Sequence, residues 1–395
     1  MNRKWLLVLI SVFLGLSGAL AQQSRMDVVK GRGRLVCGVN AVLPGFGFLD
    51  QKTGKYTGFD VEFCRAVAAA LFGDPDKVDY VPLDARVRFQ AVQNGEVDVA
   101  FRNTTVTANR DGALGVDFLP VTFYDGQGVM VKKGRANSLR ELQDATFCTT
   151  QGTTNEKNIT DYIRAQRWRG AKVLTFEDGA KVMNAFLQGR CDAFTADKSQ
   201  LVGYRATAPK PEELVILKET ISKEPLAGFV RENDSRWRDA LSWIVYATIQ
   251  AEEYGITQKN LDQFLKSEVP EIRRFLGLEG TLGQDLGLPR DFVVRVIRAV
   301  GNYGEIYDRF FGAKSPFYIP RTGTLNASSG TGASCTVRPS AKPQCPAPAT
   351  SSSRPWSWAS WPGASSSSSP RPGPAWPPRA SPSASPSSPR RRGLA

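Results

Sequence analysis

The fold is decided by a stretch early in the chain, "GFDVEFCRAVAAALFG" at residues 58–73. Its apolar residues recur every three or four positions between two glycines, and this pattern predicts an amphipathic helix that ends at Gly73. Two apolar runs flank it, "RLVCGV" at 34–39 and "KVDYVPL" at 77–83, and each has the length and composition of a strand. Strand, helix and strand in this order predict a βαβ unit in a mainly parallel sheet.

The same alternation continues along the chain and then starts again after "YDGQGVMVKKG" at 124–134. In the first half it adds a helix at 86–95 and a strand at 97–101. In the second half we expect strands at 145–150, 172–176 and 191–197, and helices at 139–143, 155–167 and 178–189. The fold class is therefore α/β.

Two similar halves joined by Gly-rich extended segments predict two lobes with a cleft between them. The extended run at 224–231 is expected to return the chain to the first lobe, where helices from 236 to about 312 would pack. We assign 28–127 with 229–320 to lobe 1 and 128–228 to lobe 2, with hinges at "QGVMV" (127–131) and "PLAGF" (225–229). In open α/β sheets, ligands bind beyond the carboxyl ends of the strands.

The first 21 residues have the pattern of a secretory signal peptide. Arg3 and Lys4 precede an apolar run from Trp5 to Leu16, and the segment closes with Ala19-Leu20-Ala21. The alternative is a terminal core helix. A signal peptide cleaved after about Ala21 predicts an exported, periplasmic protein.

The last 69 residues, 327–395, consist almost entirely of Ser, Pro, Ala, Arg, Gly and Trp. All but Val337, Lys342, Gln344 and Leu394 have codons with C or G at the second base. A one-base shift in a GC-rich gene produces this bias, so we expect an inserted base near codons 325–330 and a disordered tail. The alternative is a genuine low-complexity linker. Resequencing this region distinguishes the two.

The net charge of +13 does not indicate a nucleic-acid-binding protein. Residues 327–395 hold eight of the 51 basic residues and none of the 38 acidic ones, and the signal segment holds two more basic residues. That leaves 41 basic against 38 acidic residues between 22 and 326. A body this close to neutral has no electrostatic footprint for nucleic acid.

Four cysteines lie in the body of the chain, Cys37, Cys64, Cys148 and Cys191. An even number in an exported chain favours disulfides. Their grouping suggests Cys37–Cys64 and Cys148–Cys191, although the sequence allows three connectivities and also four free thiols. Without a CxxC pair or any histidine, a metal site is disfavoured, and no cofactor is expected.

Three segments concentrate polar side chains at expected strand ends: "RNTTVTANRD" (102–111), "TTQGTTNE" (149–156) and "CDAFTADKS" (191–199). Arg110 can grip a carboxylate through two parallel hydrogen bonds. The helix start at Thr153 and Thr154, with Glu156 completing a T-x-x-E capping box, offers free N–H groups to the same carboxylate. Asp197 can bind an ammonium group, so the set complements a zwitterion.

Each of these residues also has a purely structural alternative. Arg110 can be a surface residue, Thr153 only a helix cap, and Asp197 the cap of the next helix. The case for a site is that three complementary pieces lie at equivalent points of the two lobes.

The chain resembles the periplasmic substrate-binding proteins of polar amino-acid ABC importers, and within them the general L-amino-acid-binding branch. The resemblance covers about 28–320 and rests on motifs in the same order: "CGVN…LPGF", "GFDVEFCRAVAAALFGD", "RFQAVQNGEVDV", "RNTTVTANRD", "YDGQG", "QGTTNE", "ISKEPL", "AEEYGIT" and "GNYGE". It implies a type II periplasmic-binding-protein fold of two lobes, each a mixed, mainly parallel sheet flanked by helices, joined by two hinge crossings.

The resemblance also implies a role for each site residue. Arg110 would bind the ligand α-carboxylate with Thr105, Thr153 and Thr154, and Asp197 would bind the α-amino group with Asn103. Asn40 and Leu43 would line the side-chain wall, and Ala85 replaces an aromatic residue of narrow-specificity relatives, which suggests a roomier pocket. Arg102 departs from the Ser of some cationic-amino-acid binders, and would disfavour Lys and Arg ligands if it points inward.

The implied function is capture of free L-amino acids by closure of the cleft, followed by delivery to the permease of an ABC importer. We expect a monomer and no chemistry on the ligand. Two alternatives remain: an amino-acid-precursor dehydratase on the same fold, which would need a general acid other than histidine, and the ligand-sensing domain of a receptor.

Overall fold

The computed structural model describes residues 23–328. The expected signal peptide, and the low-complexity tail beyond Ser328, lie outside this range. Within it, no helix is long and apolar enough to cross a bilayer.

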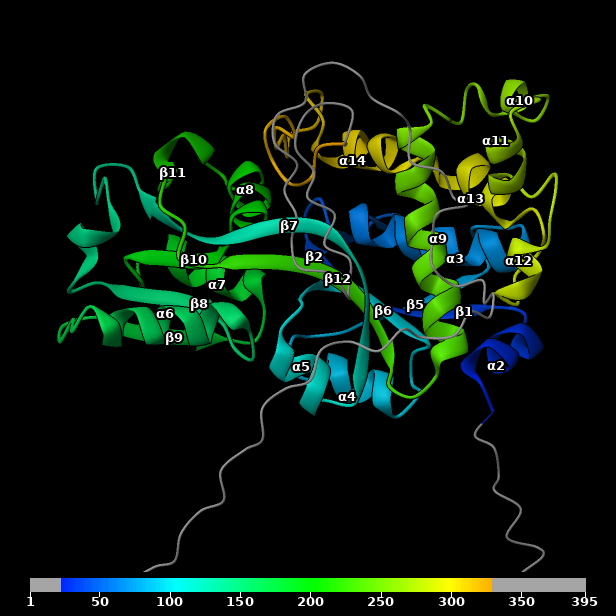
Figure 1. The fold of residues 1–395 in the computed structure, drawn as a ribbon. Helices are drawn as coiled ribbons and strands as arrows, with labels where there is room; N and C mark the ends of the chain where they lie inside the picture. Colours follow the sequence, from blue (N-terminus) through cyan, green and yellow to red (C-terminus); the bar gives the residue numbers. More distant parts are fainter. Residues whose placement is uncertain (1–22, 329–395) are drawn as a thin grey trace, which may run out of the picture. The chain divides into compact units, whose positions relative to one another are not determined.

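The described chain alternates strands and helices in the expected order (Figure 1). The strands are β1 Leu35–Val39, β2 Val42–Leu43, β3 Gly47–Asp50, β4 Lys55–Thr57, β5 Val78–Pro82, β6 Val99–Thr105, β7 Val116–Lys132, β8 Thr146–Thr150, β9 Lys172–Phe176, β10 Ala193–Asp197, β11 Leu214–Ile216 and β12 Lys223–Arg231. The helices are α2 Arg25–Arg32, α3 Phe59–Phe72, α4 Arg88–Gln93, α5 Ala108–Ala113, α6 Thr154–Ala165, α7 Gly179–Leu187, α8 Lys198–Ala206, α9 Ser235–Glu253, α10 Leu261–Phe264, α11 Pro270–Phe275, α12 Leu282–Asp285, α13 Phe292–Val300 and α14 Tyr303–Phe311, with 3-10 turns η1 Leu139–Leu142 and η2 Pro211–Glu213.

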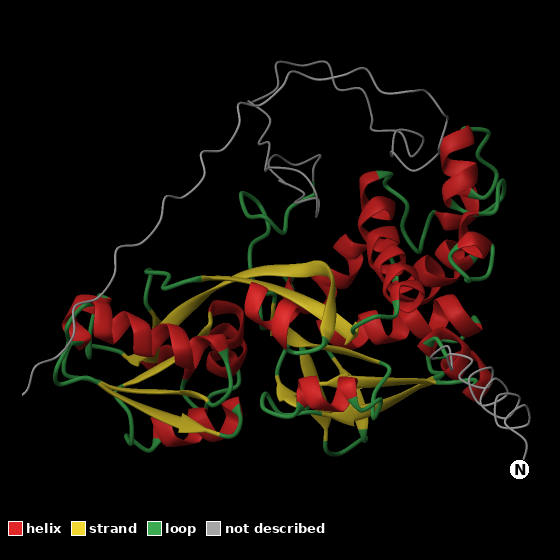
Figure 2. Ribbon diagram, turned by 60° about the horizontal axis from the view of Figure 1, so that its bottom comes forward, coloured by secondary structure: helices red, strands yellow, loops and turns green. Residues whose placement is uncertain are grey.

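Two half-sheets meet at one long strand (Figures 1 and 2). The strand order is β5-β1-β6-β12-β7 in the first half and β7-β10-β8-β9 in the second, with β11 also paired to β7. β1 runs parallel to β5 and β6, and β8 runs parallel to β9 and β10. Lobe 1 is built around the first half-sheet and lobe 2 around the second, and the prediction of a mixed, mainly parallel α/β fold is confirmed.

The two crossings between the lobes lie in the antiparallel pair β7 and β12. β12 pairs with β7 from Lys223, opposite Gly126, to Arg231, opposite Val116. Beyond this point, β7 pairs with β10 through 127–131. Both segments expected as hinges therefore belong to continuous paired strands.

Helix α3 forms where the sequence pattern places it and packs against the C-terminal helices α9 and α13. It ends at Gly73, which has the left-handed φ of 73° that favours glycine. It begins after Gly58, where an added Cβ would lie 2.1 Å from the backbone oxygen of Phe46. Glycine at 58 is therefore required by this close approach.

Strand β6 differs from the expectation because it continues to Thr105 instead of stopping at Phe101. Every residue of β6 is buried, including Arg102, Asn103 and Thr105. Asn103 has a φ of 34°, a conformation that few non-glycine residues adopt. These polar residues thus form the end of the strand and not a loop behind it, and pairing of Thr104 and Thr105 to β12 extends the strand to this point.

Both expected disulfides are present. Cys37–Cys64 links β1 to α3, and Cys148–Cys191 joins β8 to the segment before β10, with Cα–Cα distances of 6.1 and 5.8 Å. One bridge per lobe is the connectivity that the grouping of the cysteines favoured.

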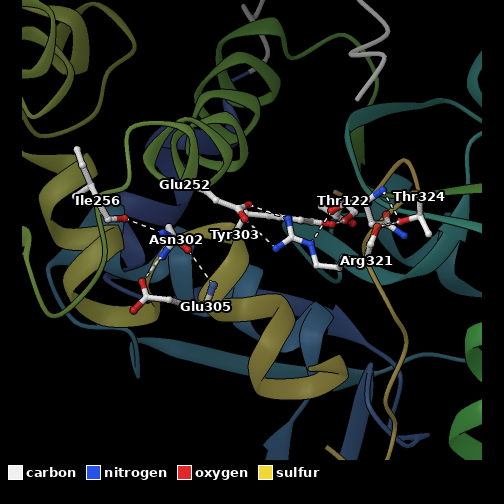
Figure 3. Close-up of polar contacts among 9 residues, drawn as sticks. Thr122, Glu252, Ile256, Asn302, Tyr303, Glu305, Arg321 and Thr324 are labelled. Carbon is white, nitrogen blue, oxygen red and sulfur yellow. Dashed lines mark hydrogen bonds and ion pairs between the residues drawn. The ribbon is translucent and has the colours of Figure 1, made fainter. Parts of the chain in front are cut away.

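Polar contacts join the C-terminal helices to one another and to β7 (Figure 3). The guanidinium of Arg321 donates to both carboxylate oxygens of Glu252, at 2.8 and 2.9 Å. Tyr303 Oη donates to the backbone oxygen of Thr122 on β7, at 2.8 Å. Asn302 caps α14 and donates to Ile256 O. The Tyr303 bond attaches the helical extension to β7, and the other bonds join parts of the extension to one another.

Candidate functional site

A cavity lies between the two lobes, and polar side chains from both of them line it. Its lining residues are Asn40, Arg88, Arg102, Asn103 and Thr105 from lobe 1 and Thr150, Thr153, Thr154, Asn155, Gly179, Asp197, Gln200 and Tyr204 from lobe 2. Seven of the ten residues expected at the site are among them: Asn40, Arg102, Asn103, Thr105, Thr153, Thr154 and Asp197.

The lobes are closed over this cavity. Tyr204 Oη on α8 donates to Val42 O on β2, at 3.3 Å, and Arg86 of lobe 1 faces Glu177 of lobe 2 at 3.6 Å. The cavity has a volume of about 20 Å³. By a comparable measure a single water needs roughly 10–15 Å³, so the closed cavity has room for little more than one water.

Asp197 ends β10 and directly precedes α8, the position of a helix cap. Its side chain nevertheless makes no capping bond to α8. Instead its carboxylate accepts from Asn155 Nδ2 at 2.8 Å and from Gln200 Nε2 at 2.7 Å. Burial, together with the negative charges of Asp125 and Glu224, raises the pKa of Asp197 well above its ordinary value. A ligand cation placed beside it would relieve this unfavourable burial of charge.

Arg102 is only 5% exposed and lines the cavity, so it points inward. Its Nε donates to Leu83 O at 2.9 Å and its Nη1 to Asn103 Oδ1 at 3.4 Å. Asn103 Oδ1 also accepts from Asn40 Nδ2 at 3.1 Å, and its backbone N–H donates to the buried Asp60. These bonds fix the lobe 1 wall of the cavity.

Thr153 is the N-cap of α6, as the sequence predicts. Its Oγ1 accepts from Glu156 N at 3.1 Å and donates to Thr150 O at 2.6 Å. The carboxylate of Glu156 accepts from Gly152 N and not from Thr153 N, so the expected capping box is displaced by one residue. The hydroxyl of Thr153 thus already donates one hydrogen bond and accepts another. An anion would therefore bind at the first backbone N–H groups of α6 and not at this hydroxyl.

Glu224 on the β12 crossing joins the two lobes at the edge of the cavity. It is 1% exposed, and one of its oxygens accepts from Thr105 Oγ1 of lobe 1 at 2.6 Å and from Thr154 Oγ1 of lobe 2 at 2.7 Å. Asn158 Nδ2 and Ser222 Oγ donate to its other oxygen. Both threonine hydroxyls therefore donate to Glu224 in this closed arrangement.

Three expected site residues are buried but do not line the cavity. Arg110 is beside Thr105, whose backbone oxygen accepts from its Nη1 at 2.8 Å, and burial lowers the pKa of its guanidinium to about 10. Its Cζ also lies 5.4 Å from the centroid of the Phe89 ring. Leu43 and Ala85 are at most 1% exposed. Arg110 is thus a buried residue in contact with Thr105, and not a surface residue.

Sequence reasoning missed Arg88, Thr150, Asn155, Gly179, Gln200 and Tyr204 in the lining, and Glu224 at its edge. Glu224 had a signal, since it is the one acidic residue of the crossing strand and lies next to its start. Arg88 had none, because an arginine at the start of an amphipathic helix is normally solvated. Gln200 and Tyr204 fall on the inner face of α8, a helix for which no site residue was expected.

Comparison with known proteins agrees with this architecture. The chain matches the family described as bacterial extracellular solute-binding proteins, family 3, over residues 35–262. It is 49% identical over 311 residues to the General L-amino acid-binding periplasmic protein AapJ of Rhizobium johnstonii, an alignment that covers 78% of this chain and 91% of the relative. It is 48% identical over 303 residues to the Glutamate/glutamine/aspartate/asparagine-binding protein BztA of Rhodobacter capsulatus, covering 76% and 89%.

A solved structure titled "ABC transporter / periplasmic binding protein from Brucella ovis with glutathione bound" superposes with a TM-score of 0.74. It shares 47% identity and covers 78% of this chain and 96% of its own. The type II periplasmic-binding-protein fold is thereby confirmed. Since the family match spans more than half of the sequence and the fold agrees with it, the protein is a member of the bacterial extracellular solute-binding proteins, family 3.

Proposed function

We propose that this protein binds free L-amino acids in the cavity between its lobes and delivers them to the permease of an ABC importer. The observation that carries the proposal is the cavity's pairing of a buried carboxylate, Asp197, with buried guanidinium groups and the N-terminus of α6. These are the charges that complement an α-ammonium and an α-carboxylate. The printed names of the two relatives, both amino-acid-binding proteins, support the same class of ligand.

The α-ammonium group would bind to Asp197, which Asn155 and Gln200 hold in place from one side. Asn103 and its partner Asn40 form the wall opposite. Burying a carboxylate alone is unfavourable because it loses its hydration, and an ammonium group bound beside it offsets part of that cost. The Asp197 side chain is therefore proposed to orient the ligand.

The α-carboxylate would bind at the free N–H groups of Thr154 and Asn155, with positive charge supplied from lobe 1. Arg110 lies next to Thr105 on that side. A direct two-bond contact requires its guanidinium to turn from Thr105 O toward the ligand. Because Thr105 and Thr154 lie on different lobes, a bound carboxylate holds the lobes together.

Binding by closure follows from where these groups lie. The ammonium partner belongs to lobe 2, and the lobe 1 wall supplies the guanidinium groups, so one ligand satisfies both only when the lobes meet. The ligand then shifts the open and closed populations by its difference in affinity for the two states. We propose that the chain acts as an exported, periplasmic monomer and leaves its ligand chemically unchanged.

Titration calorimetry against the twenty common L-amino acids tests the proposal. We expect one-to-one binding of several amino acids, and a loss of roughly 30-fold or more in affinity in Asp197→Asn, because truncating one partner of a buried charge pair costs about 2–5 kcal/mol. Asp161→Asn, an exposed carboxylate on α6, is the matched control and should bind as the unchanged protein does. Absence of heat with every amino acid, or full affinity in Asp197→Asn, would contradict the proposal. Conversion of the amino acid, detected by mass spectrometry, would instead show an enzyme.

A further inference from the structure

Gly203 lies inside α8, at a position where the helix itself does not favour glycine. It is one of the nine residues Lys198–Ala206 and is buried. Its φ is not positive, so the backbone conformation does not require glycine there. Relative to alanine, glycine in a helix interior lowers the stability of the helix. The helix thus gains nothing locally from glycine at 203.

The nearest neighbour of Gly203 across the cleft is the backbone of lobe 1. A Cβ added to Gly203 would lie 2.7 Å from the carbonyl oxygen of Pro44, which follows β2. A contact this short is strongly repulsive, and a backbone oxygen cannot turn away as the end of a side chain can. The closed lobes therefore leave no room for a Cβ at 203.

Tyr204, the next residue of α8, bonds to the same part of lobe 1. Its Oη donates to Val42 O at 3.3 Å. Burial raises the pKa of Tyr204, so its hydroxyl stays protonated and can donate. Its ring packs against that of Phe194 on β10, with the centroids 5.7 Å apart. Two adjacent residues of lobe 2 thus meet one short stretch of lobe 1, residues 42–44.

This contact is better shielded from water than the ion pair between the lobes. The side chains of Arg86 and Glu177 are 46% and 49% exposed, and an exposed ion pair contributes little to stability. Gly203, Tyr204 and Pro44 are all buried. Neither Gly203 nor Pro44 lines the cavity. The contact can therefore control how closely the lobes approach without touching the ligand.

We propose that Gly203, Tyr204 and residues 42–44 form a latch, which sets how far the lobes close and hence the affinity for every ligand of the cavity. The inference deepens the proposed function and rests on it. Gly203 is a positioning residue here, because it determines the separation at which the two cavity walls meet. Choice among ligands stays with the residues that line the cavity.

Gly203→Ala gives the sharpest test, because folding and binding should respond in opposite directions. Alanine stabilises a helix interior relative to glycine, so the thermal midpoint of the ligand-free protein should rise by about 1–3 °C. The added methyl group would prevent full closure, so the affinities for L-glutamate and L-glutamine should both fall about 5- to 100-fold. The ratio of these two affinities should change by less than about twofold, because the cavity lining is unaltered.

Tyr204→Phe tests whether the two residues of α8 act together. Alone it should weaken binding about 2- to 10-fold, because it removes one neutral hydrogen bond. In Gly203→Ala the bond to Val42 O is already stretched, so adding Tyr204→Phe should have a smaller effect than it has in the unchanged protein. Gly31→Ala in α2, where an added Cβ would have nothing within 4 Å, is the matched control and should keep both affinities.

Titration calorimetry and thermal unfolding measure all of these quantities. If the unchanged protein bound no amino acid, the proposed function would be refuted. Full affinity in Gly203→Ala, an altered ratio of the two affinities, or fully additive effects of the two substitutions would overturn the latch alone. A lower thermal midpoint in Gly203→Ala would also overturn it, because the fold and not closure would then require the glycine.

Discussion

At the scale of single residues, the site is a collection of buried charges. Asp60, Asp197, Arg88 and Arg102 are each at most 5% exposed. Burial raises the pKa of both carboxyls and lowers the pKa of both guanidinium groups. In the closed arrangement these charged groups have lost most of their solvation. Either water in an open cleft or a charged ligand in the closed one would stabilise them.

Burial of Asp60 should make the unfolding free energy of the protein depend on pH. Burial raises the pKa of Asp60 to about 7, against the opposing effects of the Asn103 N–H and Arg102. Because this pKa lies above the value of about 3.9 in an unfolded chain, the stability that Asp60 contributes is complete below about pH 4 and is lost as the pH rises to about 7. Asp60→Asn should remove that loss. The difference in unfolding free energy between variant and unchanged protein should therefore move in the variant's favour from pH 4.5 to pH 7.5.

Urea denaturation at the two pH values measures this difference. Asp76→Asn, with a side chain 83% exposed, is the control and should show nearly the same difference at both. If Asp60→Asn also showed no change between pH 4.5 and 7.5, Asp60 would not be the proton-binding group assigned here.

At the scale of secondary-structure elements, β12 is both one of the two crossings between the lobes and a strand that carries a residue at the edge of the cavity. Glu224 on this strand accepts from Thr105 on β6 and from Thr154 at the start of α6, so one carboxylate connects both lobes. Separation of the two lobes would break at least one of these two hydrogen bonds. We therefore assign to Glu224 a positioning role in closure and not direct contact with the ligand.

In Glu224→Gln, the amide replaces a charged acceptor with a neutral one and leaves an NH₂ group facing hydroxyl donors. The closed state should lose about 1–2 kcal/mol, and bound amino acid should dissociate roughly 5- to 30-fold faster. Stopped-flow displacement measures this rate, with Glu212→Gln on the exposed turn η2 as control. An unchanged dissociation rate in Glu224→Gln would remove the residue from the closing mechanism.

The two disulfides each constrain one lobe, and their loops differ modestly in length, with sequence separations of 27 and 43 residues. The chain-entropy model gives about 3.5 and 4 kcal/mol for closing such loops. Replacing either pair with serines should thus lower the unfolding free energy by a similar amount, measured by urea denaturation. A negligible loss for Cys148→Ser with Cys191→Ser would mean that the bridge does not form in solution.

Elements with a clear period could be predicted, and so could polar residues at strand ends, but a buried polar residue elsewhere could not. The helix at 58–73 and the strands at 34–39 and 191–197 follow from apolar spacing and glycine punctuation, and they occur as α3, β1 and β10. The end of β6 was placed too early because Arg102 and Asn103 are polar, although both are buried inside the strand. Asp197 could be chosen from its position after a strand. Arg88 could not, because only the tertiary structure distinguishes a buried helix-start arginine from a solvated one.

At the scale of the whole described molecule, the central claim is that closure and ligand binding are one event. The closed form buries the guanidinium groups of Arg88 and Arg102 and the carboxylate of Asp197 around a cavity of about 20 Å³. Opening returns these charges to water, so we expect the free protein to be mainly open. A ligand that supplies the missing counter-charges should favour the closed form.

Small-angle X-ray scattering of the same preparation, with and without saturating L-glutamate, tests this claim most directly. The account predicts a smaller radius of gyration when the amino acid is bound, and in the presence of ligand a curve that matches the closed arrangement of the lobes described here. Identical curves in the two states, with binding shown by calorimetry in the same buffer, would contradict capture by closure.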